Sequence, residues 1–371
     1  MKFEKINDIM LLIVTLFNFA DTVCKIRKKV TMNQDLILDR LTNNIIDYTI
    51  KTREKVYNNV REEMVNYYWN VGRMIVEEEQ GGDITPEYGR KLYLELAKRL
   101  TKQMGKGYSR SNLFNMRNFY ITYPIVQTYG RLSWSHFCEL IGIKDENERK
   151  FYEKETVNSK WSTRELGRQI ESGLYQRLLL SDGKANKEKV LQLAKEGQII
   201  EQPKDIIKEP YVFEFLGIKE EKPLLEKDLE YKLIRQLEDF LLELGKGFMF
   251  VGSQQRITID NTHYYVDMVF YNKILKCYVL IDLKMGKLKP ENMGQMNMYL
   301  NYYETEVNDV GDNKPIGIIL CAKKDNVVAE YSLGGINNNL FASNYTYYMP
   351  NKDELIAQVE KVINENEENE K

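Results

Sequence analysis

Three charged residues that a core-building strand would not choose stand in a strongly apolar stretch of this sequence, residues 264–284. They are Asp267, Asp282 and Lys284, and their neighbours are mostly β-branched, aliphatic or aromatic. The stretch is typical of two adjacent β-strands joined by a short turn. An ionised side chain among apolar neighbours is strongly unfavourable unless it is paired or bound to a metal ion. The pattern therefore predicts a site built from two carboxylates and one ammonium group.

The spacing of the second acid and the lysine places them on one face. Side chains alternate along a strand, so Asp282 and Lys284 point the same way, and Leu283 points the other way. The alternative interpretation is an internal Asp–Lys ion pair that tolerates burial, since buried pairs are weak stabilisers. That alternative leaves Asp267 unexplained.

Length and composition restrict the class of protein. A chain of 371 residues favours two domains, and a net charge of −2 means that any nucleic-acid affinity must come from local clusters of basic residues. Only two histidines are present, which argues against a histidine-rich metal centre. Widely spaced cysteines argue against a disulfide framework or zinc ribbon and favour a reducing cytoplasm; they are Cys24, Cys138, Cys277 and Cys321.

Composition shifts divide the chain into four segments. Residues 1–31 form an N-terminal extension, 32–185 a helical domain, 186–204 a polar linker and 205–371 a second domain with an acidic C-terminal tail. The apolar run 9–20 in the extension has three interpretations: a signal peptide, an extra amphiphilic helix, or sequence upstream of a start at Met32. The run is short for a membrane span, and we expect a cytoplasmic protein without stable membrane association.

The helical domain contains a helix-turn-helix pattern. Helical periodicity covers residues 33–80 and 89–104, and Gly105-Lys106-Gly107 ends the second helix. Another helix begins near Ser109 or Ser111, either of which can act as N-cap. Two helices joined by a short glycine-containing turn are typical of DNA-binding modules. A further helix, 162–180, is expected to pack within the domain or against a second copy.

The segment 89–131 is locally basic. It carries nine lysine or arginine residues against the single acid Glu95, and phosphate binding requires such an imbalance. The alternative interpretation is a basic face that is only solvated. The residues expected to contact DNA are Lys106, Arg110, Asn112, Asn115 and Arg117.

The second domain alternates helices and strands. We expect a helix over 225–244, strands over 248–259, 264–271 and 275–285, a helix over 290–304, and strands over 315–321 and 340–348. A mixed α/β sheet with helices packed on it is the compact solution for this order. Glu230 lies in the first helix and Gln295 in the later one.

This pattern resembles the PD-(D/E)XK nuclease superfamily, and more closely its YhcG-like branch. The isolated D…D-x-K pattern is weak, but the order of elements and several flanking phrases match, from about Tyr57 to Tyr348. The phrases are Val-Gly-Arg-Met-Ile-Val-Glu-Glu-Glu-Gln, Leu-Ser-Trp-Ser-His-Phe, Phe-Leu-Leu-Glu-Leu-Gly-Lys-Gly-Phe and Lys-Pro-Glu-Asn-Met-Gly-Gln-Met-Asn. The resemblance implies a helical, helix-turn-helix-like DNA-binding domain followed by a restriction-endonuclease-like αβββαβ core.

The resemblance also implies roles for particular residues. Asp267, Asp282, the backbone carbonyl of Leu283 and Glu230 would hold Mg²⁺, with Mn²⁺ as a substitute. Lys284 would orient or help deprotonate the attacking water. Gln295 would hydrogen-bond within the site. The expected activity is endonucleolytic hydrolysis of DNA phosphodiester bonds.

Two positions depart from the family pattern. Asp282 stands where this branch more often has glutamate, which we interpret as a change of metal geometry, and Val266 precedes Asp267 where proline is common. The alternative functions are a catalytically silent DNA-binding protein and a partner-recruiting protein with the same folds. Cleavage of both DNA strands would favour a homodimer.

Overall fold

The computed structural model describes residues 2–81, 86–124, 132–181, 185–218, 225–323 and 339–369. Side chains are described from residue 38 onward, except those of residues 80–91 and 367–369 within these ranges. The chain forms two compact units, one containing Met1–Tyr67 and the other Tyr68–Ile125 and Leu132–Lys371. Each unit is considered by itself below.

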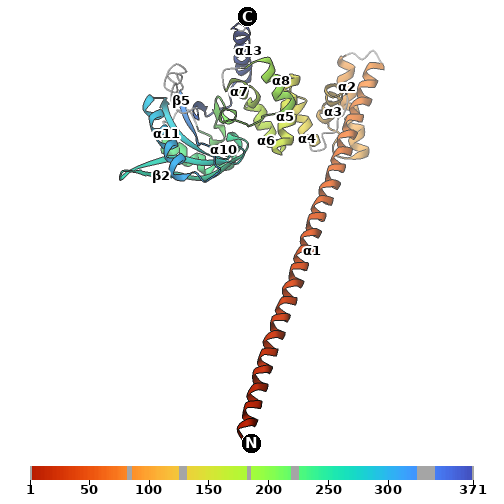
Figure 1. The fold of residues 1–371 in the computed structure, drawn as a ribbon. Helices are drawn as coiled ribbons and strands as arrows, with labels where there is room; N and C mark the ends of the chain where they lie inside the picture. Colours follow the sequence, from red (N-terminus) through yellow and green to blue (C-terminus); the bar gives the residue numbers. More distant parts are fainter. Residues whose placement is uncertain are drawn as a thin grey trace. The chain divides into compact units, whose positions relative to one another are not determined.

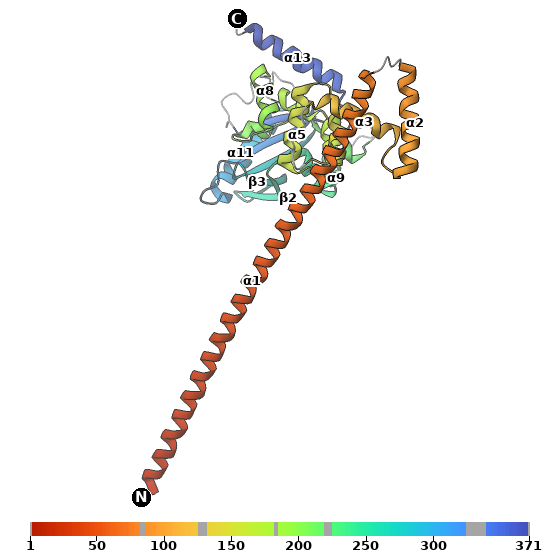
Figure 2. The same ribbon diagram turned by 90° about the vertical axis from the view of Figure 1, so that its right-hand side faces the viewer.

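Within the described residues, the first unit consists of one long helix. Helix α1 runs without interruption over Lys2–Gly81, and its part up to Tyr67 belongs to this unit (Figure 2). The sequence predicted this helix over residues 33–80, and the structure extends it through the N-terminal extension. No helix within the described ranges is both long and apolar enough to cross a membrane.

The second unit begins with a bundle of helices. The end of α1 packs on α2 (Pro86–Met104) and α3 (Arg110–Thr122) around Ile75, Leu113 and Met116. Ser109 is the N-cap of α3, as predicted, because its side chain accepts the hydrogen bond of the Asn112 amide at 3.2 Å. The remaining helices of the bundle are α4 (Trp134–Leu140), α5 (Glu146–Ser159), α6 (Thr163–Glu171), α7 (Leu174–Leu180) and α8 (Lys187–Glu196).

A six-stranded mixed sheet with its covering helices follows the bundle in the second unit (Figure 1). Its strand order is β1-β6-β5-β4-β3-β2; β2, β3 and β4 are antiparallel, whereas β4, β5, β6 and β1 are parallel. The strands are β1 (Tyr211–Val212), β2 (Phe248–Ile259), β3 (Thr262–Asn272), β4 (Cys277–Lys287), β5 (Ile316–Lys323) and β6 (Leu340–Thr346).

Helices cover both faces of this sheet. On one face α9 (Glu226–Arg235) and α10 (Leu237–Leu244) pack against Phe270 and Ile281. On the other, α11 (Pro290–Tyr302) packs against Leu280 and Ile319 and continues as a π-helical turn, Tyr303–Val307. Helix α13 (Lys352–Asn369) follows the last strand. A helical N-terminal region followed by a mixed α/β domain of the αβββαβ order confirms the predicted fold class.

Three details differ from the sequence-based expectations. The predicted helix 225–244 is two helices, because the backbone leaves the helical region at Gln236. The predicted helix 162–180 is broken by Gly173, whose φ of +64° lies in the left-handed region that favours glycine. Residues 186–204, assigned to a linker, carry α8, which packs on α5.

Candidate active site

The second acid and the lysine meet in the middle of the sheet. Asp282 and Lys284 lie on β4 and face α11, because Leu280 on the same side of the strand packs in the α11 core. Lys284 Nζ lies 2.7 Å from Asp282 Oδ2 and 3.5 Å from Glu226 Oε2 at the start of α9. Asp282 is only 3 % exposed, so this is a buried ion pair.

The first acid lies beside this pair on the neighbouring strand. The β3–β4 pairing extends to Met268 and Ile281, the residues directly beside Asp267 and Asp282 in the chain. The charge of Asp267 acts on the Asp282 carboxyl, so the two side chains lie near each other. The backbone N–H of Leu283 donates to Asp267 Oδ2 at 2.8 Å, which fixes one carboxylate oxygen.

The helical acid reaches the site through a residue that the sequence analysis did not single out. Gln254 Nε2 donates to Glu230 Oε2 at 2.7 Å and to Asp267 Oδ1 at 3.2 Å. Gln254 lies on β2 with a φ of +48°, an uncommon conformation for a residue with a side chain. One amide group therefore joins the carboxylates of two separate elements.

The predicted glutamine on α11 is connected through a tyrosine. Gln295 hydrogen-bonds the Tyr299 side chain one helical turn later, and the Tyr299 hydroxyl donates to the Tyr265 carbonyl at 3.1 Å. Burial and the negative charges of Asp282 and Asp267 raise the pKa of Tyr299 to about 12. Tyr299 therefore lies within the electrostatic influence of both carboxylates. The sequence analysis did not identify it as a site residue.

Electrostatics at the site reflect uncompensated negative charge. Burial, followed by the charge of Asp267, raises the pKa of Asp282 to about 7 in spite of the nearby ammonium. Burial raises the pKa of Glu230, and the charge of Asp267 adds to this. Burial alone would lower the pKa of Lys284. The attraction of the adjacent Asp282 carboxylate is stronger than this effect, so the pKa of Lys284 is raised. A cation would relieve this repulsion.

The donor set fits a hard divalent cation with few protein ligands. Within the described ranges, no three histidine, cysteine or acidic side chains gather closely enough to hold a metal ion by themselves. Asp267 and Asp282 nevertheless interact through their charges, and Mg²⁺ is commonly held by one or two carboxylates with waters completing its shell. Leu283 has a fully buried side chain, so only its main chain could contribute.

The predicted DNA-contacting residues of the helical bundle fall into two groups. Lys106, between two positive-φ glycines, and Arg110, at the start of α3, are exposed. Arg117 is paired with Glu79 at 2.6 Å. Asn112 donates to the Gly107 carbonyl at 2.6 Å and accepts from Trp134 Nε1 at 2.8 Å. Asn115 hydrogen-bonds Cys138. The last three side chains are engaged in contacts within the bundle.

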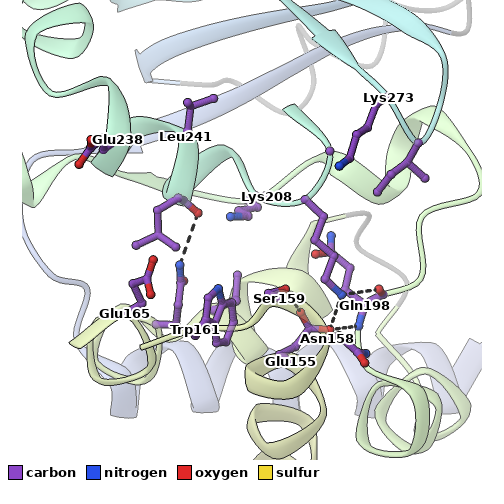
Figure 3. Close-up of a pocket in the computed structure, with 17 residues that line it drawn as sticks. Glu155, Asn158, Ser159, Trp161, Glu165, Gln198, Lys208, Glu238, Leu241 and Lys273 are labelled. Carbon is purple, nitrogen blue, oxygen red and sulfur yellow. Dashed lines mark hydrogen bonds and ion pairs between the residues drawn. The ribbon is translucent and has the colours of Figure 1, made fainter. Parts of the chain in front are cut away.

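A separate cavity of about 500 Å³ lies where α5, α6 and α10 approach the β3–β4 turn (Figure 3). Two of its charged groups are paired: Lys246 Nζ lies 2.7 Å from Glu155 Oε1 and donates to the Gln198 carbonyl at 3.0 Å. Lys208 is buried and donates to the Glu243 carbonyl. None of the lining residues belongs to the carboxylate site.

Comparisons with known proteins agree with this arrangement. Residues 204–360 match the model of the YhcG PDDEXK nuclease domain, and residues 44–177 match that of the DUF1016 N-terminal domain. YhcG of Escherichia coli (strain K12), named as a candidate nuclease, is 35% identical over 353 residues, which cover 86% of this chain and 93% of that protein.

A solved repair endonuclease from Pyrococcus abyssi also matches, over 34% of this chain and 49% of that one. Its TM-score is 0.24 and its sequence identity 16%, and no argument rests on that likeness.

Proposed function

Because this chain belongs to the YhcG family of PDDEXK nucleases, we propose that it is a Mg²⁺-dependent DNA endonuclease. The observation that carries the proposal is the cluster of Asp267 and Asp282, whose charges act on each other, with Lys284 held 2.7 Å from Asp282. A bound Mg²⁺ supplies Lewis acidity toward the scissile phosphate and lowers the pKa of a coordinated water.

The chain's own residues have distinct parts in this mechanism. Asp267 and Asp282 bind the cation, and the Leu283 N–H keeps one oxygen of Asp267 fixed. The Lys284 ammonium orients the attacking water and balances charge that develops on the phosphate. Glu230 adds negative charge from α9, and Gln295 holds the Tyr299 hydroxyl beside the carboxylates. Mn²⁺ is expected to replace Mg²⁺, because both accept carboxylate and water ligands.

The helical bundle is proposed to hold the DNA. The exposed Lys106 and Arg110 lie at the turn and at the N-terminal end of α3, the end that approaches DNA in helix-turn-helix proteins. The described cysteines Cys138, Cys277 and Cys321 form no disulfides, which fits a cytoplasmic protein. Cleavage of both strands of a duplex favours a homodimer.

A cleavage assay tests the proposal directly. Purified protein is incubated with supercoiled plasmid and Mg²⁺, Mn²⁺ or EDTA, and nicked and linear products are quantified. We expect cleavage only with metal, and a loss of at least about 100-fold in rate for Asp282→Asn and Lys284→Met, since each removes a group that stabilises the transition state. Asp353→Asn and Lys361→Met, exposed changes of the same types on α13, serve as matched controls.

The catalytically silent alternative makes a different prediction. If wild-type protein and the Asp282→Asn variant bind DNA equally and neither cleaves plasmid with any divalent cation, the chain is a DNA-binding protein. A partner-recruiting role through residues 162–180 would need an exposed apolar face there, but Leu166, Leu174 and Leu178 are buried. Those side chains are therefore not available as a docking face.

A further inference from the structure

An apolar stripe runs along the exposed part of α1 in the first unit. Its side chains are 38 to 74 % exposed, although each is large and hydrophobic. An exposed contiguous apolar surface of this kind marks an interaction site. The stripe consists of Leu38, Leu41, Ile45, Tyr48, Val56, Val60, Met64 and Tyr67.

The spacing of the stripe keeps it on one face of a straight helix. Successive members are three or four residues apart, with Thr52 in the position between Tyr48 and Val56. Ile45, Val56 and Tyr67 are separated by eleven residues, a repeat close to the natural period of the α-helix. The opposite face carries polar or charged side chains up to the buried Val65: Asn43, Asp47, Lys51, Glu54 and Asn58. This segment of the helix is therefore amphipathic, and its apolar face is exposed.

The length of the stripe indicates which helix can pack along all of it. From Leu38 to Tyr67 the stripe extends for about 45 Å at 1.5 Å per residue. Among the helices that the described ranges contain, the next longest are α2 with 19 residues and α13 with 18. Neither is long enough to cover it, whereas a second α1 matches it in length and period. We infer that two copies of this chain associate through their α1 stripes as a two-stranded coiled coil.

The buried area is sufficient for such a dimer. An apolar side chain of this size removes roughly 80 Å² from water, so the eight stripe residues of two copies bury about 1,300 Å². That value lies within the range of specific, stable interfaces.

Charge along the same segment is balanced. Residues 38–67 carry five acidic and five basic side chains, so two copies do not repel each other through net charge. The acidic residues are Asp39, Asp47, Glu54, Glu62 and Glu63, and the basic residues are Arg40, Lys51, Arg53, Lys55 and Arg61. A second copy is therefore an acceptable partner on electrostatic as well as steric grounds.

One consequence rests on the proposed nuclease function. Each chain carries the carboxylate site described above, and a dimer would bring two such sites to one DNA duplex. Association itself rests on the stripe alone and does not require activity. The inactive Asp282→Asn variant is therefore expected to associate as strongly as the wild type.

The first experiment measures mass and dissociation of the full chain by analytical ultracentrifugation over a concentration series. We expect a dimer for the wild type. Ile45→Glu with Val56→Glu places two carboxylates per chain in the stripe and should weaken association on the order of 100-fold or more. Asn43→Glu with Asn58→Glu adds the same charge on the opposite face and should leave the dimer intact.

The second experiment separates lost association from lost folding. Thr52→Cys lies at the centre of the stripe and should form a disulfide-linked dimer under mild oxidation, above the level that the native cysteines give in the wild type. Asn58→Cys should not exceed that level. A wild type that stays monomeric at all concentrations, or equal crosslinking through both positions, would overturn the inference. So would unchanged association of the Ile45→Glu, Val56→Glu protein.

Discussion

At the residue scale, the sequence predicts the site residues where charged side chains interrupt an apolar strand. Asp267, Asp282 and Lys284 stand out because burial of an ionised group needs a reason. Gln254 and Tyr299 gave no such signal. A glutamine in a half-exposed strand and a tyrosine on the inner face of a helix have ordinary explanations in sequence, and only the fold shows them beside the carboxylates.

Gln254 is expected to stabilise the metal-free site and so to reduce the stability gain from Mg²⁺ binding. Its amide donates to Glu230 and Asp267, so it substitutes for a cation between two repelling carboxylates. Gln254→Glu should lower the melting temperature without metal and enlarge the stabilising shift that Mg²⁺ produces. Gln255→Glu adds the same charge at the next position, where the Gln255 amide donates to the Ser253 carbonyl rather than to either carboxylate, and should leave the Mg²⁺ shift at the wild-type value. An equal Mg²⁺ shift in wild type and Gln254→Glu would contradict this role.

The raised pKa of Asp282 should make metal binding sensitive to pH. A proton must leave this carboxyl before it can bind a cation, and its pKa is about 7 without metal. Below pH 7 the apparent Mg²⁺ affinity should therefore fall about tenfold per pH unit, and above that pH it should level off. Titration calorimetry across this range provides the measurement. In Asp282→Asn the dependence should vanish, and persistence of the slope would assign the proton to another group.

At the element scale, apolar periodicity located most of the helices and strands, and the misses have physical causes. Helix α5 buries Glu148, Glu153 and Glu155 alongside its aromatic residues, so its inner face carries no apolar repeat. Strand β1 has two residues, too few for any period. No glycine or proline marks the break between α9 and α10 at Gln236. Both helices pack on the sheet, and this packing, which a single sequence does not show, accounts for the break.

The two groups of predicted DNA-contacting residues should respond differently to substitution. Lys106→Ala with Arg110→Ala removes exposed charges, so it should weaken DNA binding and reduce the slope of log affinity against log salt by up to about 2. Arg117→Ala breaks the ion pair with Glu79 and should instead lower stability by roughly 1–2 kcal/mol with an unchanged slope. Fluorescence anisotropy over a salt series and thermal melts distinguish these outcomes. A reduced slope for Arg117→Ala alone would reverse the assignment.

At the scale of the whole second unit, buried charges join the helical bundle to the sheet domain. Arg177 is fully buried and lies 2.5 Å from Glu243 on α10, and Arg168 bonds both Glu214 and Glu243. Long-range pairs of this kind have no signature in a single sequence, because each residue alone is an ordinary surface type. Lys208 is buried beside this network. Burial lowers the pKa of Lys208 to about 7, because it outweighs the attraction of the Glu243 carboxylate for the ammonium.

That lowered pKa determines how stability should depend on pH. Between pH 7 and 10 the unfolded chain holds a proton on Lys208 that the folded chain does not, so the free energy of unfolding rises with pH through this window. Below pH 7 both states are protonated and this contribution no longer changes. The gain between pH 7.5 and 9 should be roughly 2 kcal/mol, and Lys208→Met should lack it.

Urea unfolding of wild type and variant at the two pH values measures the difference. Lys273→Met, a change at an exposed lysine lining the same cavity, should follow the wild type. If Lys208→Met and wild type gained stability equally between these pH values, the ammonium of Lys208 would have to be retained in the folded protein. Its charge would then be balanced by Glu243 through the network that also holds Arg168 and Arg177.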